Sequence, residues 1–142
     1  MRRLLFALAL VFLATPALAE KELDMKGNWA CDPAPMLIRG EWTTLTYRIE
    51  IAEQRDHLIK GTFYWSLPED KGVKGEKTGG EKSFKGEWTA LGVIGWDRSV
   101  EIVSLDGLER TTGAFDDKDT IRFVHSKVGK DAWVSRSVCK RQ

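Results

Sequence analysis

The stretch IKGTF, residues 59–63, is one of several near-copies of a single pattern in this chain. Each copy reads apolar, basic, glycine, variable, aromatic, and the others are MKGNW (25–29), IRGEW (38–42) and FKGEW (84–88). A looser copy, TGAF, places Gly113 two residues before Phe115. Because side chains alternate between the two faces of a strand, the glycine and the aromatic share one face. In 58–67 that face is the apolar one.

Glycine inside a strand normally weakens it. It is useful where a sheet must bend sharply, and an aromatic on the same face covers the gap that the glycine leaves. Several strands with inward-facing glycines therefore predict an all-β fold in which an antiparallel sheet curls into a closed up-and-down barrel. A flat two-sheet sandwich with incidental glycines is the alternative.

The rest of the chain fits strands joined by short turns. Residues 43–52 alternate, with Leu45, Tyr47, Ile49 and Ile51 on one face. Turns are predicted at 53–56, at the DG pair 106–107, at 116–119 and at 127–131. No window shows helical spacing of apolar residues, so we expect eight to ten strands and no substantial helix. The long polar stretch 68–83 is expected to form a ragged hairpin or a mobile lid.

The first residues have the pattern of a secretory signal peptide. A positive MRR precedes an apolar run, and Ala17-Leu18-Ala19 is an A-x-A cleavage site. We therefore expect residues 1–19 to be a signal peptide and 20–142 to be a single β-barrel domain, periplasmic or secreted. The apolar run is too short to span a membrane, and no second stretch is long enough.

The charges and cysteines narrow the class further. The 22 basic and 21 acidic residues are interspersed, which argues against nucleic acid or an anionic membrane as the main partner. Cys31 and Cys139 are the two cysteines, and in an exported protein such a pair predicts a disulfide. It joins the first strand of the domain to the last. Two free thiols are the alternative.

Gly27-Asn28-Trp29 on the first strand, followed by an up-and-down series of strands, resembles the calycin group of lipocalins, fatty-acid-binding proteins and avidins. The resemblance implies a small barrel that binds ligands. In lipocalins a basic residue near the last strand packs across this tryptophan. If the two cysteines pair directly on antiparallel neighbours, Trp29 lies opposite Arg141, and Arg136 is the competing candidate.

The chain also departs from these families. About seven residues separate its first two strands, which leaves no room for the helical pair of fatty-acid-binding proteins. The helix-free layout is most similar to avidin, but the biotin-contacting residues have no match in order, so biotin binding is not expected to carry over.

Catalysis and metal binding have little support in the sequence. The two histidines, His57 and His125, lie far apart and lack ligand-spaced cysteines. His57 is expected to be solvated beside a turn. His125 is either a strand-end residue near the barrel mouth or a polar group of a pocket. No nucleophile signature occurs, so we predict no catalytic residues, no metal site and no cofactor.

Tryptophans give the best candidate site, since the chain has six of them. Most should fill the core, but one or two can line an open end and stack on an apolar or sugar ligand. The segment 91–99 has loosening glycines and places an aromatic, an acid and a base together. Asp97 and Arg98 can equally form a surface pair. The predicted ligand-binding residues are Trp65, Trp88, Trp96, Asp97, Arg98 and His125.

Two functions follow from these features. The first is an exported, non-catalytic protein that holds a small apolar or aromatic ligand in the barrel. The alternative is a protein-interaction module, such as an inhibitor of a secreted or host hydrolase, because small exported disulfide-bonded barrels of bacteria include lysozyme inhibitors. Tyr64 and Arg122, on the outer faces, are then candidates for the partner surface. The S-G-x-x-Y loop of one inhibitor family is not found.

Overall fold

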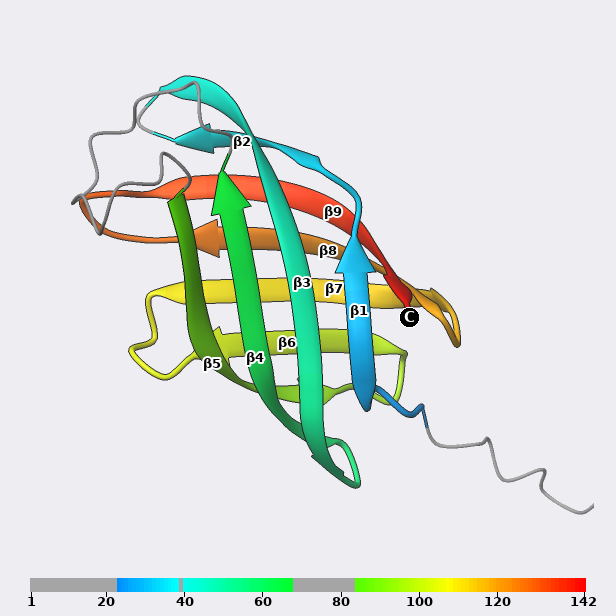
Figure 1. The fold of residues 1–142 in the computed structure, drawn as a ribbon. Helices are drawn as coiled ribbons and strands as arrows, with labels where there is room; N and C mark the ends of the chain where they lie inside the picture. Colours follow the sequence, from blue (N-terminus) through cyan, green and yellow to red (C-terminus); the bar gives the residue numbers. More distant parts are fainter. Residues whose placement is uncertain (1–22, 39, 68–83) are drawn as a thin grey trace, which may run out of the picture.

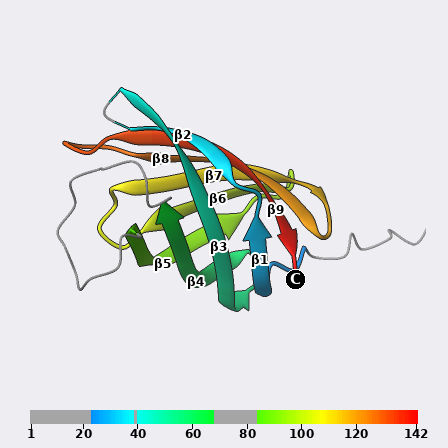
Figure 2. The ribbon, with the colours of Figure 1, turned by 45° about the horizontal axis from the view of Figure 1, so that its top comes forward.

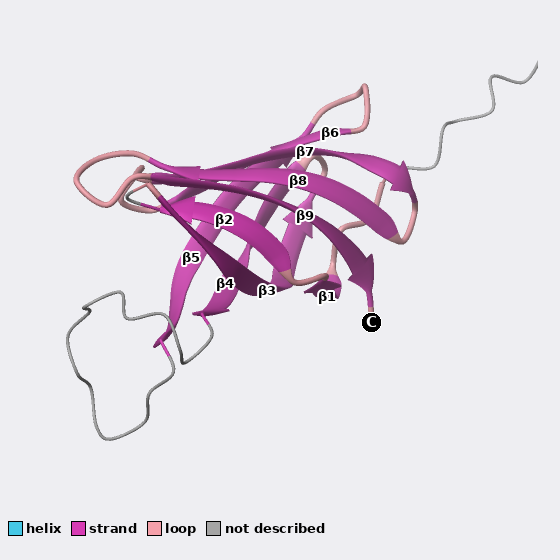
Figure 3. Ribbon diagram, turned by 90° about the horizontal axis from the view of Figure 1, so that it is seen from above, coloured by secondary structure: helices cyan, strands magenta, loops and turns pink. Residues whose placement is uncertain are grey.

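The computed structural model describes residues 23–38, 40–67 and 84–142, which form one antiparallel sheet and no helix (Figures 1 and 3). Its strands are β1 (Gly27–Cys31), β2 (Ala34–Ile38), β3 (Glu41–Arg55), β4 (Leu58–Leu67), β5 (Phe84–Ile94), β6 (Ser99–Ser104), β7 (Glu109–Asp117), β8 (Thr120–Lys127) and β9 (Trp133–Arg141). The predicted all-β class is confirmed. None of the described residues belongs to a helix long and apolar enough to cross a membrane.

The sheet closes on itself. β1 and β2 both pair with β3 on one side and with β9 on the other, so they are two halves of one strand. Each remaining strand pairs with its sequence neighbour, and within the described residues the result is a closed eight-stranded barrel of the predicted up-and-down type. The interruption lies at Asp32–Pro33, where the register shifts by one residue. Proline has no N–H for the ladder, so this strand breaks where Pro33 stands.

The repeated glycines sit where the wall curls. A Cβ on Gly61 would lie 2.2 Å from the carbonyl oxygen of Glu50. A Cβ on Gly113 would lie 2.3 Å from the carbonyl oxygen of Arg122. Both positions therefore exclude any side chain. The structure refines the prediction in one respect. The ring that covers Gly113 belongs to Phe123 on the neighbouring strand, and not to the aromatic two residues along.

Two copies of the motif serve a different purpose. The prediction of an inward bend is wrong for Gly40, whereas Gly27 does share the inward face with Trp29 and lies opposite Ile51, but it begins β1 instead of lying within the strand. Gly27 has φ of 115° and Gly40 has φ of 81°, values that favour glycine. Gly27 begins β1, and Gly40 lies in the turn between β2 and β3. Trp42, the aromatic of the IRGEW copy, is 66% exposed. The motif predicts curvature only where the glycine lies within a strand that is paired with a neighbour on each side, as at Gly61 and Gly113.

The seam between β1 and β9 is closed as predicted. Cys31 lies directly opposite Cys139, their Cα atoms are 3.9 Å apart, and they form a disulfide. The same register places Trp29 opposite Arg141. Figures 1 and 2 show the end of β9, marked by the C-terminus, beside the start of β1. The first and last strands are thus joined by both hydrogen bonds and a covalent bond.

Turn positions agree with the sequence in most cases. The β6–β7 turn falls at Asp106–Gly107, where Gly107 has φ of 71°. The turn predicted at 53–56 begins too early, because β3 bulges between Ile51 and Glu53 and continues to Arg55. The predicted signal peptide, 1–19, and the predicted hairpin or lid, 68–83, lie outside the described residues.

Candidate functional site

The barrel has two ends that differ in composition. The sealed end carries the start of β1, the end of β9 and the turns β3–β4, β5–β6 and β7–β8. The far end carries the end of β4, the start of β5 and the turns β2–β3, β6–β7 and β8–β9. In Figure 1 the C-terminus marks the sealed end. The two ends also differ in the side chains that face the interior of the barrel.

Arg141 closes the sealed end. Its guanidinium carbon lies 4.5 Å from the ring centroid of Trp29, and it donates hydrogen bonds to the carbonyl oxygens of Asp24 and Lys26. Trp29 has no exposed surface, and its indole N–H donates to the carbonyl oxygen of Met25 at 2.9 Å. The basic residue expected across the tryptophan is therefore Arg141. The competing candidate Arg136 is exposed on the outer face of β9.

The far end has a polar wall inside the barrel. His125 on β8 is 1% exposed, with its Nδ1 2.9 Å from the hydroxyl of Thr111 and its Nε2 2.7 Å from the hydroxyl of Ser137. Burial lowers the pKa of His125 to about 3, so the imidazole is neutral near pH 7. His125 thus lies near the end of β8, as one of the two sequence interpretations expected, but its ring is buried and lines neither groove described below.

Aromatic side chains share this end with the polar wall. Trp88 stacks on Phe63 with ring centroids 4.3 Å apart, and Trp65 lies over Gly86, where a Cβ would be 2.5 Å from the indole. Trp133 lies 6.4 Å from the ring of Tyr47. All three tryptophans face inward, yet they keep part of their surface exposed, unlike Trp29. Solvent therefore reaches the inward aromatic face at the far end.

Tyr47 is the most unusual residue of the far end. Its side chain is 3% exposed and its ring centroid lies 4.3 Å from that of His125. The hydroxyl is buried and has no hydrogen-bond partner among the described residues. Burial, and to a lesser extent the charge of Glu109, raise the pKa of Tyr47 far above its ordinary value. The hydroxyl is therefore neutral near pH 7, and it has no hydrogen-bond acceptor among the described residues.

Among the described residues, one ion pair borders this region. Glu109 on β7 and Lys127 on β8 are paired in register, with the carboxylate 2.9 Å from the ammonium group. Their side chains are 13% and 30% exposed, respectively. Because the pair faces inward by strand alternation, the rim near the polar wall carries two opposite charges that neutralise each other.

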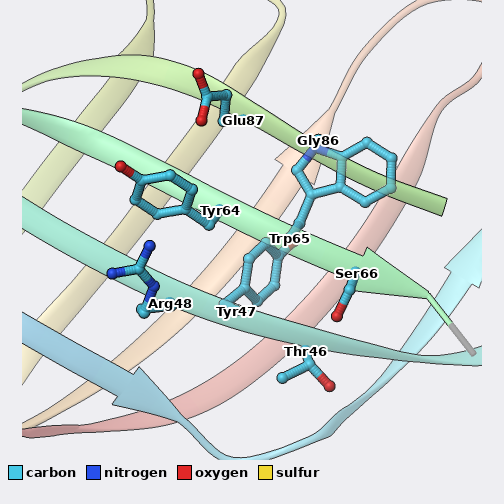
Figure 4. Close-up of a pocket in the computed structure, with 8 residues that line it drawn as sticks. All are labelled: Thr46, Tyr47, Arg48, Tyr64, Trp65, Ser66, Gly86 and Glu87. Atoms are coloured by element: carbon cyan, nitrogen blue, oxygen red, sulfur yellow. The ribbon is translucent and has the colours of Figure 1, made fainter. Parts of the chain in front are cut away.

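A groove of about 410 Å³ runs across β3, β4 and β5 toward the far end (Figure 4). Its lining includes the inward residues Tyr47 and Trp65 together with outward ones. On the outer side the guanidinium of Arg48 lies 4.0 Å from the ring centroid of Tyr64, and the Tyr64 hydroxyl donates to Glu50 at 3.3 Å. Tyr64, predicted as a partner-surface residue, thus lies on this groove.

A second groove, of about 740 Å³, lies over the outer face of β7, β8 and β9 beside Pro33. It contains Arg122, the other residue predicted for a partner surface. Arg122 is held by Asp116, with 2.6 Å between guanidinium nitrogen and carboxylate oxygen. Arg136 also lines it.

The predicted site residues divide between the two ends. Trp65, Trp88 and His125 come together at the far end, but Trp96, Asp97 and Arg98 form the β5–β6 turn at the sealed end. Trp96 is 88% exposed, and its ring lies 5.0 Å from that of His57. Hydrogen bonds from the hydroxyl and the N–H of Ser99 lower the pKa of Asp97. The described residues show no ion pair between Asp97 and Arg98.

Sequence reasoning missed several residues of the far end. They are Tyr47, Glu109, Thr111, Lys127, Trp133 and Ser137. Tyr47 was placed correctly on the inward face of its strand, but only as a core residue. Polar residues at alternate positions, as in Ser135 and Ser137, were the available signal. In the described part of the chain no cluster of three or more histidine, cysteine, aspartate or glutamate side chains is suited to a metal ion.

Comparison with known proteins supports the fold alone. No protein-family model matches the chain, and no curated protein is significantly similar to it. A structure described as EF1p2_mFAP2b bound to DFHBI matches with a TM-score of 0.55 and 10% identity, over 82% of this chain and 93% of that one. The S-type phycobiliprotein lyase CPES from Guillardia theta matches with a TM-score of 0.51 and 10% identity, over 83% and 88%. The chain has a calycin-like barrel fold, as the resemblance of its first strand implied.

Proposed function

We propose that this chain is an exported, non-catalytic binding protein that holds a small apolar or aromatic ligand at the far end of its barrel. The observation that carries the proposal is the partial exposure of three inward-facing tryptophans, Trp65, Trp88 and Trp133. Burying apolar surface is favourable, by about 25 cal/mol per Å². A ligand that covers these rings buries the apolar surface that the free protein leaves exposed, and this burial contributes to its binding free energy.

The similar structures add independent support. One of them was solved bound to DFHBI, and the other is described as a phycobiliprotein lyase. Export is supported by the signal-peptide pattern of residues 1–19 and by the Cys31–Cys139 disulfide, a bond that persists in oxidising compartments. The same two features support a periplasmic or secreted location.

The chemistry of the far end favours binding over catalysis. A general acid or base works best when its pKa lies near the working pH. His125 has a pKa of about 3, and both of its ring nitrogens are engaged by Thr111 and Ser137. Both cysteines are joined in the disulfide and supply no thiolate nucleophile. Orienting a ligand is the role that this wall fits.

The test uses N-phenyl-1-naphthylamine, an uncharged probe whose fluorescence increases in apolar surroundings. The oxidised protein should enhance this fluorescence in a saturable way, and Trp88→Leu should weaken the binding at least several-fold. Trp42→Leu, at an exposed tryptophan on the outer face of β3, is the matched control and should leave binding unchanged. Equal binding by wild type and both variants would reject the far end as the site.

The alternative, a protein-interaction module, is favoured by one observation at the other end. Trp96 projects from the β5–β6 turn with 88% of its side chain exposed, and exposed tryptophans are frequent hot spots of interfaces. If the chain inhibits a hydrolase such as lysozyme, added protein should slow peptidoglycan hydrolysis, and Trp96→Ala should relieve the inhibition. Undiminished hydrolysis with the wild-type protein excludes that enzyme as the target.

A further inference from the structure

The ligand's chemistry can be narrowed, on the premise that the far end is a binding site. We propose that the Tyr47 hydroxyl is the hydrogen-bond donor of this site and that its ligand is an uncharged aromatic compound carrying a hydrogen-bond acceptor, such as a carbonyl oxygen. This inference rests on the proposed function and adds a recognition element to the aromatic surface. It is carried by the position of Tyr47, by the commitments of its neighbours and by the charges around it.

Tyr47 lies at the groove, with its hydroxyl covered in the free protein. It lies on the inward face of β3, directly opposite Trp65 on β4, and both residues line the groove of about 410 Å³ (Figure 4). A buried hydroxyl without a partner costs roughly 1–3 kcal/mol. Hydroxyls of buried tyrosines usually find a partner. The protein therefore keeps one strong donor unsatisfied beside its exposed aromatic rings.

No neighbouring polar group of the described residues forms a hydrogen bond with the Tyr47 hydroxyl. His125 is the closest ring with hydrogen-bonding atoms, but its two nitrogens already contact the hydroxyls of Thr111 and Ser137. Ser135, also on the inner side of the polar wall, donates to the carbonyl oxygen of Pro35 at 2.9 Å. Among the described residues the Tyr47 hydroxyl has no acceptor, and in this proposal the ligand supplies it.

The charges select against an anion. Within the described strands, Lys127 is the one cation on the inner face at the far end, and Glu109 neutralises it at 2.9 Å. On the inner face a ligand carboxylate would lose its hydration and meet, among the described residues, only the paired Lys127, while the carboxylate of Glu109 repels it. On the outer face Arg48 and Glu87 both line the groove, so the charges there are of opposite sign. Burying such a charge without a partner is costly. A neutral acceptor avoids this cost and still receives the Tyr47 hydrogen.

The test compares three naphthalene probes that differ at one position: naphthalene, 2-acetylnaphthalene and 2-naphthoate. Isothermal titration calorimetry with the oxidised protein should give roughly tenfold tighter binding of 2-acetylnaphthalene than of naphthalene, the ratio for one hydrogen bond. 2-Naphthoate should bind more weakly than the ketone. Tyr47→Phe should abolish the preference for the ketone and leave naphthalene affinity unchanged. Thr44→Val, which removes an exposed hydroxyl on the outer face of β3 away from the groove, is the control and should preserve the preference.

A second readout needs no ligand. Because Tyr47→Phe removes an unsatisfied hydroxyl and keeps the ring, the urea midpoint of the free protein should stay the same or rise. A lowered midpoint would show that the hydroxyl has a partner in the free protein and would overturn the inference. An unchanged ketone preference in Tyr47→Phe would overturn it as well, while leaving ligand binding at the far end intact. If none of the three probes binds, the proposed function fails and this inference fails with it.

Discussion

The two ends of this barrel use the same kinds of residues in opposite ways. At the sealed end, Trp29 has its N–H bonded to Met25 and its face covered by Arg141, and nothing of it is exposed. At the far end, Trp88 faces the same interior but stays partly exposed, and Tyr47 keeps a buried hydroxyl without a partner in the described residues. An inward aromatic residue is therefore structural when its surface is fully buried and its polar atoms are hydrogen-bonded within the chain. It is a candidate for ligand binding when part of its surface is exposed or a polar atom lacks a partner.

The largest expected effect tests the covalent closure of the β1–β9 seam. The Cys31→Ala/Cys139→Ala variant should lose about 4–5 kcal/mol of unfolding free energy in the chain-entropy model, because the bond spans 108 residues in sequence. Urea unfolding of oxidised wild type and variant measures it. A loss under about 1 kcal/mol would mean that the hydrogen-bonded seam holds without the bond.

The next effect compares one tryptophan from each end. Trp29→Ala should cost about 3–5 kcal/mol, the range for deleting a fully buried large side chain. Trp88→Ala should cost clearly less, because its ring is partly exposed in the native state. Urea midpoints of the two variants decide the matter. If both variants lose the same unfolding free energy, Trp88 is packed as completely as Trp29, and the far end is not more open than the sealed end.

Arg141 should matter more than a second arginine on the same strand. Arg141→Met removes charged hydrogen bonds to backbone carbonyls and the contact with Trp29, and should cost about 2 kcal/mol. Arg136→Met, on the exposed outer face, should change stability by less than about 0.5 kcal/mol. Similar values for both variants would show that the sealed end is held by apolar packing alone.

The smallest effect is a pH dependence from the polar wall. The folded pKa of His125, about 3, lies below its ordinary value near 6.5. The unfolded chain therefore binds more protons between these values, so stability falls as the pH decreases from 6.5 toward 3. The loss approaches about 1.4 kcal/mol per pH unit well below pH 6.5 and is about 1 kcal/mol between pH 6.5 and 5.5.

Urea unfolding at these two pH values measures the dependence on His125. His57→Asn should keep the slope, because that ring lies at the other end, and His125→Asn should flatten it. A wild type equally stable at pH 6.5 and 5.5 would contradict the buried, neutral state of His125.

The sequence by itself determined the wall and its closure. Alternation fixed the inward faces of β3 and β4, the crowded glycines at 61 and 113 marked the curvature, and the cysteine register predicted that Trp29 lies opposite Arg141. These features are periodic or local, so they can be read along one strand or from one cross-strand pair. The glycine at 40 misled, because the same letters occur there in a turn, and the glycine at 27 stands at the start of a strand instead of within it.

Only the tertiary structure decided what each end contains. Trp96 and Trp65 look alike in sequence, but the up-and-down path sends the β5–β6 turn to the sealed end and brings Tyr47, Trp88 and His125 together from β3, β5 and β8. Whether a hydroxyl such as that of Tyr47 finds a partner depends on side chains from strands that are far apart in the chain. Strand periodicity carries the direction of a side chain. It carries no information about which partners are left for it across the barrel.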